Sequence, residues 1–555
     1  MLSTLLMAAM MQGAGAPVVI NEFSYDDSST DDREFVELYN ASKASIDISG
    51  WKLDSADSNG PNTAYTVPAK TMLAVGAFYV MGSAKVPNVT QVVGTTNLWE
   101  NSDESLTLRD AKGAIVDTLV YEGNKTSSTA TWTKGLIEKA PVWGNFASID
   151  GLETSWSRLR DGFDTGDGRD FHMMRSTPGK TNNVTAAAAI DDNFDKGTID
   201  AAYPGLFGTF SNSHYIDPTA AGKKNPNLIP SSPQGGNALV VWDSTGGGNA
   251  NFLPAAGIKD VVVECWIYID GTPEPIKGQH ESWSIGVQGT TGTFYNSPDP
   301  STKIGSKANG NTGITATYQV LDDGATLYLI DHGSGAGTMT ILGQIAIQAG
   351  KNDGWQRLRL EVAGDYASLR FGGNYGAADG VSLSGLISDP VEGGIYFGFR
   401  EFVSNNAGAR PLTMDRLSIR TSKMVTTHFG KATKTTVGTP AIRIDPLPQI
   451  GARDFRINGT GMVPGGFVIY VLGNSRTSTA LGAAFPAGST LYTTPIMLFA
   501  ATTDLQGRSF MGFDIPNASS MIGTKSVLQI FNNDPALKVP APFGSTGGVE
   551  MTFGR

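Results

Sequence analysis

Short strand-like runs, in which apolar and polar residues alternate, recur along this chain, and they constrain its fold more than any other feature. Within residues 18–53, two such runs, 18–23 and 35–39, precede a tight Ser49-Gly50-Trp51 corner. A side-chain period of two is typical of a β-strand with one buried face. Similar runs continue towards the C-terminus, separated by turns rich in Gly, Asn and Asp. We therefore predict an all-β protein.

Length and composition limit the architecture further. The chain has 555 residues, and because a single hydrophobic core stops growing at about 250–300 residues, we expect several domains. Its 68 Gly and 28 Pro residues, with only 17% charged residues, fit a turn-rich β protein. The formal net charge of −11 is spread without long runs of one sign. This argues against a nucleic-acid partner, since phosphates require clustered Lys and Arg.

The N-terminal segment 1–16 has the layout of a signal peptide. Its apolar stretch, residues 2–11, is followed by small residues that suit a cleavage site. We therefore expect a secreted or cell-surface protein; a misassigned start and a buried first strand are the alternatives. No later run reaches the roughly 18 apolar residues that cross a bilayer, so we do not expect a membrane-embedded protein.

Turn and linker signals divide the rest of the chain. Pro178-Gly179 closes a first unit, and the small and polar residues that follow offer little to pack and suit a linker. The block order differs between units, which disfavours a repeat fold such as a solenoid or propeller. The predicted units are 17–183, 184–422 and 436–555.

The first unit contains a distinctive series of sequence blocks. They are Val19-Ile20-Asn21-Glu22, Glu34-Phe35-Val36-Glu37-Leu38-Tyr39-Asn40, Asp47-Ile48-Ser49-Gly50-Trp51-Lys52-Leu53, Tyr65-Thr66-Val67-Pro68, Ser105-Leu106-Thr107-Leu108 and Val116-Asp117. This series resembles the lamin-tail domain, an immunoglobulin-like β-sandwich also found in secreted bacterial proteins. Residues 104–123 predict a hairpin around the turn 110–113. The acidic stretch 154–182 looks like the C-terminal extension that often follows such domains.

The second unit opens with Asp192-Asn193-Phe194-Asp195, has a W-x-x-L-x-L-x-V strand at 355–362, and ends with a G-x-x-F-G strand at 394–398. This order resembles the concanavalin-like jelly rolls of lectins, laminin-G-type modules and some glucanases, which implies a sandwich that recognises carbohydrate. The third unit resembles C-terminal β-sandwich modules of large exported bacterial proteins. That resemblance implies no function.

One glycine-rich loop concentrates carboxylates at every third position. Its acidic residues are Asp161, Asp164, Asp167 and Asp170. Calcium takes 6–8 oxygen ligands, and an acidic loop can supply several of them. The spacing is not that of an EF-hand. The loop is therefore a candidate Ca²⁺ site, with a solvated turn whose Asp side chains cap their own backbone as the alternative.

Glycoside hydrolysis on a jelly roll requires two carboxylates, about 5–5.5 Å apart in retaining enzymes. Glu264 and Asp270 lie on one face of the run 261–270, but six strand residues span about 20 Å, and Glu361 stands alone in its run. We therefore predict no catalytic residues and keep a polysaccharide-degrading glycoside hydrolase as an alternative.

The sequence offers no candidate residue for nucleophilic catalysis by cysteine or for a catalytic zinc site. Cys265 is the only cysteine and lies in an alternating run, which indicates a buried apolar residue rather than a nucleophile. The histidines lack the H-x-x-x-H and H-E-x-x-H spacings of zinc sites. They are His172, His214, His280, His332 and His428.

Aromatic residues near loops of the second unit are the candidate ligand contacts, because lectin-like sites stack sugar rings on exposed aromatic side chains. For any one of them, core packing is the alternative. The candidates are Trp242, Trp283, Tyr295 and Tyr396.

We therefore expect an exported, non-enzymatic binding or structural protein without a required cofactor. Its expected partner is an extracellular carbohydrate or cell-envelope polymer, bound through the second unit, and other surface proteins are further candidate partners. A purely architectural component of an envelope or matrix is the main alternative. Because folds of this class host many functions, the assignment depends on the binding site.

Overall fold

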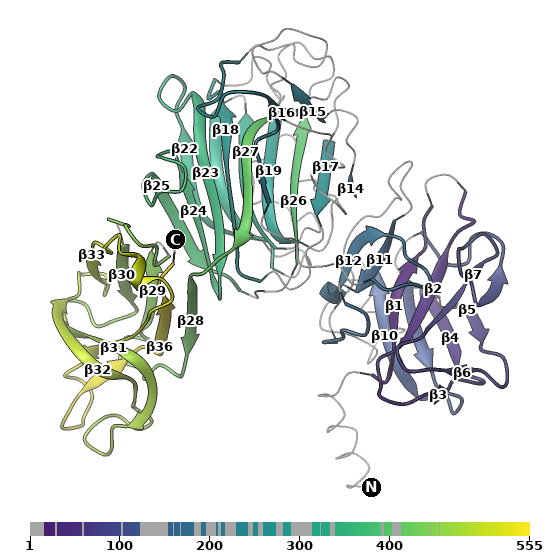
Figure 1. Cartoon of the computed structure of the whole chain (residues 1–555). Helices are drawn as coiled ribbons and strands as arrows, with labels where there is room; N and C mark the ends of the chain where they lie inside the picture. The colour runs from purple at the N-terminus through teal and green to yellow at the C-terminus, as the bar shows by residue number, and fades with distance from the viewer. Residues whose placement is uncertain are drawn as a thin grey trace.

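The protein folds into three separate β-sandwiches (Figure 1). The computed structural model describes residues 16–27, 30–57, 60–101, 104–121, 154–158, 160–166, 168–182, 190–195, 207–208, 213–216, 229–241, 248–253, 259–272, 281–289, 313–321, 323–333, 339–388, 390, 393–401, 412–445, 447–453 and 455–554. Apart from two single-turn 3-10 helices, its regular elements are strands. The predicted all-β, multidomain fold is confirmed.

The N-terminal domain packs a six-stranded sheet against a four-stranded sheet. The strand orders are β12-β11-β1-β2-β7-β8 and β10-β9-β4-β5, and β3 pairs with β6. The predicted hairpin is the antiparallel pair β9–β10. The elements are β1 (Val18–Ser24), β2 (Phe35–Asn40), β3 (Ile46–Asp47), β4 (Lys52–Asp57), β5 (Gly60–Thr66), β6 (Met72–Leu73), β7 (Phe78–Ser83), β8 (Gln91–Gly94), β9 (Glu104–Arg109), β10 (Ile115–Tyr121), β11 (Thr154–Arg158), η1 (Gly168–Asp170) and β12 (Phe171–Arg175).

The middle domain is a larger sandwich of two antiparallel sheets. The first has the order β15-β16-β27-β18-β23-β24-β25, with β13 also paired to β27, and the second has the order β14-β17-β26-β19-β20-β21-β22. The strands are β13 (Ile190–Asp192), β14 (Phe207–Gly208), β15 (Ser213–Ile216), β16 (Ala238–Val241), β17 (Gly248–Leu253), β18 (Val261–Ile269), β19 (Glu281–Gly289), β20 (Ile314–Leu321), β21 (Gly324–Asp331), β22 (Thr340–Ile347), β23 (Gly354–Ala363), β24 (Tyr366–Phe371), β25 (Val381–Leu386), β26 (Gly394–Glu401) and β27 (Leu412–Thr421).

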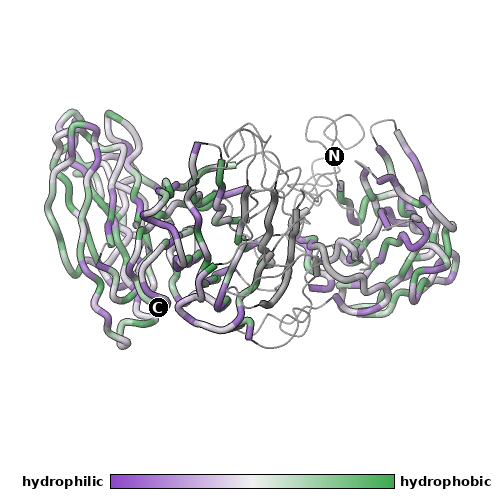
Figure 2. Tube along the Cα trace, turned by 90° about the horizontal axis from the view of Figure 1, so that it is seen from above, coloured by the Kyte–Doolittle hydropathy of each residue, from purple (hydrophilic) through white to green (hydrophobic). Residues whose placement is uncertain are grey.

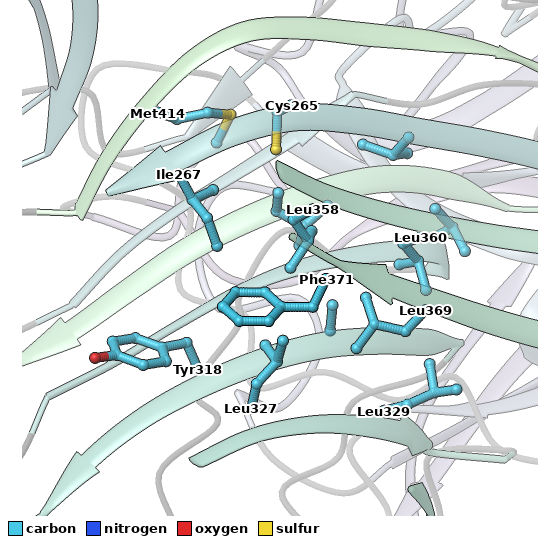
Figure 3. Close-up of a cluster of buried hydrophobic side chains, with 14 of the residues drawn as sticks. Cys265, Ile267, Tyr318, Leu327, Leu329, Leu358, Leu360, Leu369, Phe371 and Met414 are labelled. Carbon is cyan, nitrogen blue, oxygen red and sulfur yellow. The ribbon is translucent and has the colours of Figure 1, made fainter. Parts of the chain in front are cut away.

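Alternating side chains from both sheets form the core of the middle domain. On β18, Cys265 and Ile267 point inwards beside Leu358 of β23, and across the core they face Leu327 of β21 (Figure 3). Cys265 is a buried free thiol whose pKa burial raises well above its usual value. Its predicted role as a buried apolar residue is confirmed.

The third domain packs a sheet of order β28-β36-β34-β31-β32, with β35 also paired to β34, against the sheet β29-β30-β33. β28 pairs with β36, so this unit begins before the predicted residue 436. The elements are β28 (Val425–Phe429), β29 (Ala441–Asp445), β30 (Phe455–Thr460), β31 (Phe467–Ala480), β32 (Thr490–Thr502), β33 (Ser509–Phe513), η2 (Ser519–Met521), β34 (Lys525–Asn533), β35 (Phe543–Ser545) and β36 (Gly548–Thr552).

The middle and third domains share part of one hydrophobic core. Ala363 and Tyr366, from the turn region between β23 and β24, pack in the same buried cluster as Met424 and the third domain's core residues. Across the same contact, His428 Nδ1 lies 2.8 Å from Asp365 Oδ2. This shared packing joins the two sandwiches directly.

Candidate functional site

In the sheet β14-β17-β26-β19-β20-β21-β22 of the middle domain, the hydroxyl side chains on the face that points away from the core are buried. Because residues such as Ile285, Ala316 and Leu327 fill the core, their neighbours along each strand point to the other face of the sheet. Ser284 and Thr317 there are nevertheless fully buried. These hydroxyls are covered rather than solvated, and the candidate site is the cavity at one end of this face, which Gln319 lines two residues along β20 from Thr317.

Hydroxyl groups on this face are joined in one network. Ser284 Oγ lies 2.7 Å from Thr317 Oγ1, and Thr315 Oγ1 lies 3.2 Å from Thr317 Oγ1 and 3.1 Å from His332 Nε2. Burial lowers the pKa of His332 to about 3, so its imidazole is neutral at ordinary pH. The network fixes a row of polar groups across β19, β20 and β21.

A cavity of about 200 Å³ opens at one end of this face. Gln319, Thr326 and Ala346 are cross-strand partners on β20, β21 and β22, and they form one row of its lining. Tyr328, two residues along β21 from Thr326, lies beside this row. The lining residues are Gln319, Leu321, Asp323, Gly324, Ala325, Thr326, Tyr328, Ala346 and Ile347.

This lining can bind a neutral polar ligand. The Gln319 amide both donates and accepts hydrogen bonds, the Thr326 hydroxyl does the same, and the carboxylate of the exposed Asp323 accepts them. Tyr328 adds an aromatic ring with a polar end. Among these described residues there is no Lys or Arg, so the cavity offers no cation to an anionic ligand.

The acidic loop of the N-terminal domain surrounds an arginine. Arg158, fully buried on β11, donates to Asp170 Oδ2 at 3.2 Å and to Asp164 Oδ1 at 3.4 Å through Nη1, and to Asp117 Oδ2 at 3.4 Å through Nη2. Its Nε donates to Ile20 O at 2.8 Å. The guanidinium supplies the positive charge that a cation would bring to this loop.

The predicted calcium ligands do not converge on one point. Asp161 accepts hydrogen bonds from Asn21 Nδ2 at 3.0 Å and Asn182 N at 2.9 Å, away from the pair Asp164 and Asp170. Asp167 lies outside the described residues. Across the described part of the chain, no three His, Cys, Asp or Glu residues are close enough to hold a metal ion. The described carboxylates therefore do not fit a calcium site.

The two glutamates considered for hydrolysis belong to buried ion pairs on the other sheet of the middle domain. Glu264 accepts from Gly376 N at 2.8 Å and lies 3.4 Å from Arg357 Nη1 and 3.3 Å from Arg420 Nη2. Glu361 pairs with Arg359 Nη2 at 2.9 Å. These carboxylates are neutralised by guanidinium groups, an arrangement that holds structure rather than substrate.

The structure leaves the predicted aromatic contacts untested. Trp242 and Tyr295 lie outside the described residues, while Trp283 and Tyr396 are backbone positions of β19 and β26. The sequence analysis missed Tyr328. Its signal was present, because Tyr328 alternates with the apolar Leu327 and Leu329 on the polar side of β21.

The histidines are dispersed across the three domains, as their spacing indicated. His172 and His332 are buried in the N-terminal and middle domains, and His428 lies at the contact between the middle and third domains. His214 is a backbone position of β15, and His280 lies outside the described residues. These positions give no support to a shared histidine site.

Comparisons with known proteins identify part of the chain. Residues 12–123 match the family model of the lamin tail domain, so the resemblance predicted for the N-terminal unit is confirmed over about a fifth of the chain. No curated protein matches. Among the described residues, none forms a helix with the length and apolar character that crossing a membrane requires.

Solved structures similar to this chain include carbohydrate-recognition domains. The Emp47p carbohydrate recognition domain has 10% identity and a TM-score of 0.26, covering 39% of this chain and 96% of its own. The Ca²⁺-bound exoplasmic/lumenal domain of VIP36 has 7% identity and a TM-score of 0.26, covering 39% and 91%. A legume lectin-like domain from Entamoeba histolytica has 11% identity and a TM-score of 0.23, covering 38% and 90%.

Proposed function

We propose that the middle domain binds a neutral saccharide unit of an extracellular or cell-envelope polymer, without chemical conversion, in the cavity between β20, β21 and β22. The observation that carries this proposal is the cavity of about 200 Å³ lined by Gln319, Thr326 and Tyr328. Its volume is several times the roughly 30 Å³ that a water molecule occupies in the liquid. It therefore has room for a single ring-sized ligand.

The chemistry of the lining suits a sugar. A pyranose presents hydroxyl groups at its rim and an apolar ring face, and binding sites of this kind combine a few polar groups with aromatic surface. The partly exposed Thr326 and the exposed Asp323 supply hydrogen-bonding groups, and the buried Gln319 and Tyr328 form the floor of the cavity. A site for a uronate or a sulfated sugar would need a basic lining. The net charge of −11 also repels such anionic polymers at long range.

The placement of the described carboxylates supports binding without hydrolysis. Glycosidases need two carboxyl groups on either side of the scissile bond. Asp323 is the acidic residue among those that line the cavity, and the ion-paired Glu264 and Glu361 lie on the opposite sheet. One exposed carboxylate can accept hydrogen bonds from a sugar, but it cannot provide both the acid and the nucleophile.

We place this activity outside the cytoplasm, on the basis of the signal-peptide layout of residues 1–16. The N-terminal lamin-tail domain and the third domain then serve as attachment or spacer modules. Export is tested by the N-terminal sequence of the protein recovered from the culture medium or cell envelope of its source.

A glycan array probed with the full chain tests the binding proposal. Ala346→Arg places a long side chain in the cavity from an exposed position on β22, and we expect at least a tenfold loss of affinity for the glycan retained by the wild type. Thr340→Arg is the matched control, because Thr340 is also exposed on β22 and its cross-strand partner, Asp331, is outside the lining.

The array also separates the alternatives. The proposal is supported if the wild type retains neutral glycans, Ala346→Arg abolishes this retention and Thr340→Arg preserves it. Uniform absence of retention overturns it and favours the architectural role. Release of reducing ends from a bound polysaccharide would instead establish hydrolysis.

A further inference from the structure

Exposed apolar side chains are concentrated on one edge of the third domain. Half of the large apolar side chains exposed in the described residues lie here, on β31, β32, β33 and the turn between the last two. We call this surface the edge patch. Its members are Phe467, Ile496, Met497, Leu498, Phe499, Leu505, Phe510 and Phe513, which are 37–84% exposed.

The strand that carries most of the edge patch is open on one side. β32 ends its sheet in the order β28-β36-β34-β31-β32, so within the described third domain its outer edge has no strand partner. The register Val471↔Leu498 and Tyr470↔Phe499 fixes its inner edge against β31. Pro495 lacks an amide hydrogen, which limits further pairing to the segment 496–502.

The segment 496–502 of this edge lacks the charged side chains that monomeric proteins usually place on such strands. Exposed edges are normally blunted by charged side chains, above all Lys, which prevent pairing with another chain. Residues 477–503 contain no charged residue, in a chain whose overall charged content is 17%. In Figure 2, the third domain at the end of the molecule far from the N-terminal domain is drawn largely in white and green, the colours of intermediate and hydrophobic residues.

The area of the edge patch matches that of a stable dimer interface. The eight side chains are on average about half exposed, and at roughly 200 Å² for each large apolar side chain they leave roughly 900 Å² in water. A standard protein interface buries about 800 Å² from each partner. The exposed apolar area is therefore comparable with one side of such an interface, and on β32 it lies on both faces of the strand, because successive residues point to opposite faces.

We infer that the edge patch binds a second copy of this chain, with the two β32 strands paired antiparallel about a two-fold axis. Such an isologous contact places the same surface on both sides, so an uncharged apolar strand meets an identical uncharged apolar strand. Elsewhere the net charge of −11 makes two copies repel each other. The segment 477–503 brings no acidic group into the contact.

Sedimentation of the full chain over about 1–100 µM tests this inference, because dimerisation follows mass action. We expect the wild type to reach twice the mass of one chain, and Leu498→Lys to weaken association at least tenfold, since each dimer would then bury two like charges. Leu498 is exposed, so the substitution leaves the fold intact. Ser478→Lys is the matched control, at an exposed position on β31 outside the patch.

Cysteine cross-linking tests the pairing itself. In an antiparallel pair, opposed Cα atoms lie about 4.5–5.5 Å apart, so single Cys replacements along 496–500 should cross-link most strongly at the two-fold axis. The native Cys265 is buried and stays silent. The inference is overturned if the chain stays monomeric over this concentration range. It is also overturned if a dimer forms that Leu498→Lys leaves intact, or that no Cys position cross-links. Binding of the monomeric chain to neutral lipid vesicles would overturn it as well.

Discussion

Replacing Arg158 with methionine tests whether a buried guanidinium, rather than a metal ion, holds the acidic loop of the N-terminal domain. Arg158 contacts Asp117, Asp164 and Asp170 at 3.2–3.4 Å, and its guanidinium carbon lies 4.4 Å from the centre of the Phe171 ring. Methionine keeps much of the side-chain length and removes the charge. The three carboxylates then lose their common partner.

The expected loss of stability follows from burial. Removing one partner of a buried ion pair costs about 3–5 kcal/mol, because the other charges remain unpaired. In a domain of about 150–250 residues, each kcal/mol lowers the melting temperature by about 2–4 °C. We therefore expect Arg158→Met to lower the melting temperature of the N-terminal domain by roughly 6–20 °C.

Scanning calorimetry of the full chain measures this shift in the transition of the N-terminal domain, which among the described residues shares no core cluster with the other two. Arg109→Met is the control, because Arg109 pairs with Asp54 at 2.8 Å but is partly exposed, and such pairs contribute less than about 1 kcal/mol. The reasoning is refuted if the two variants melt alike. It is also refuted if a chelator destabilises the wild type, since a ligand that binds only the folded state must raise its stability.

Three further outcomes follow from buried groups. Burial raises the pKa of Glu22 to about 7 and that of Glu37 to about 8, from an ordinary 4.5. The folded state therefore keeps protons that the unfolded chain releases, so the stability of the N-terminal domain should decrease as the pH rises from about 4.5 to about 8. A series of melting temperatures across this pH range checks the prediction, and an increase in stability would contradict it. Cys265 should resist thiol reagents until denaturant is added, and rapid native labelling would contradict its burial. Leu360→Ala should destabilise the middle domain by about 2–5 kcal/mol in denaturant titrations, whereas the exposed Leu386→Ala should have little effect.

Side-chain alternation predicted the strands because it is a local property. The run 261–269 is β18, with Cys265 facing the core, and the hairpin 104–123 contains β9 and β10. In both cases the burial of one strand face fixes the pattern of the residues themselves. The pairing of β28 (Val425–Phe429) with β36, near the other end of the third domain, is a long-range contact that the local pattern does not reveal.

The described residues give no support to the calcium prediction, one of whose four residues, Asp167, lies outside them, because the partner that Asp164 and Asp170 share is a buried guanidinium. Carboxylates at Asp164 and Asp170 are visible in the sequence, but their convergence on Arg158, together with Asp117 from another strand, depends on the packing of β10 and β11. A cluster of acidic residues has the same appearance whether it surrounds an ion or a guanidinium. Sequence alone does not distinguish the two.

The candidate cavity was partly accessible to sequence reasoning. Tyr328 alternates with the core residues Leu327 and Leu329, so the pattern places it on the other face of β21, where it packs with Ile330 in a small buried cluster. Its proximity to Gln319 and Thr326 depends on the register of β20 with β21. That register is set by tertiary pairing, so the side chains could be predicted individually but not as one site.

Tyr366 of the middle domain and Met424 are buried in one cluster with core residues of the third domain, so the two sandwiches are joined by apolar packing. Rotation between them would expose this apolar contact to water, so the angle between the cavity on β20–β22 and the outer edge of β32 is held by the fold. If two chains pair through that edge, their cavities adopt one fixed separation. A polymer with matching spacing then gains avidity from geometry, without any added contact to a single sugar.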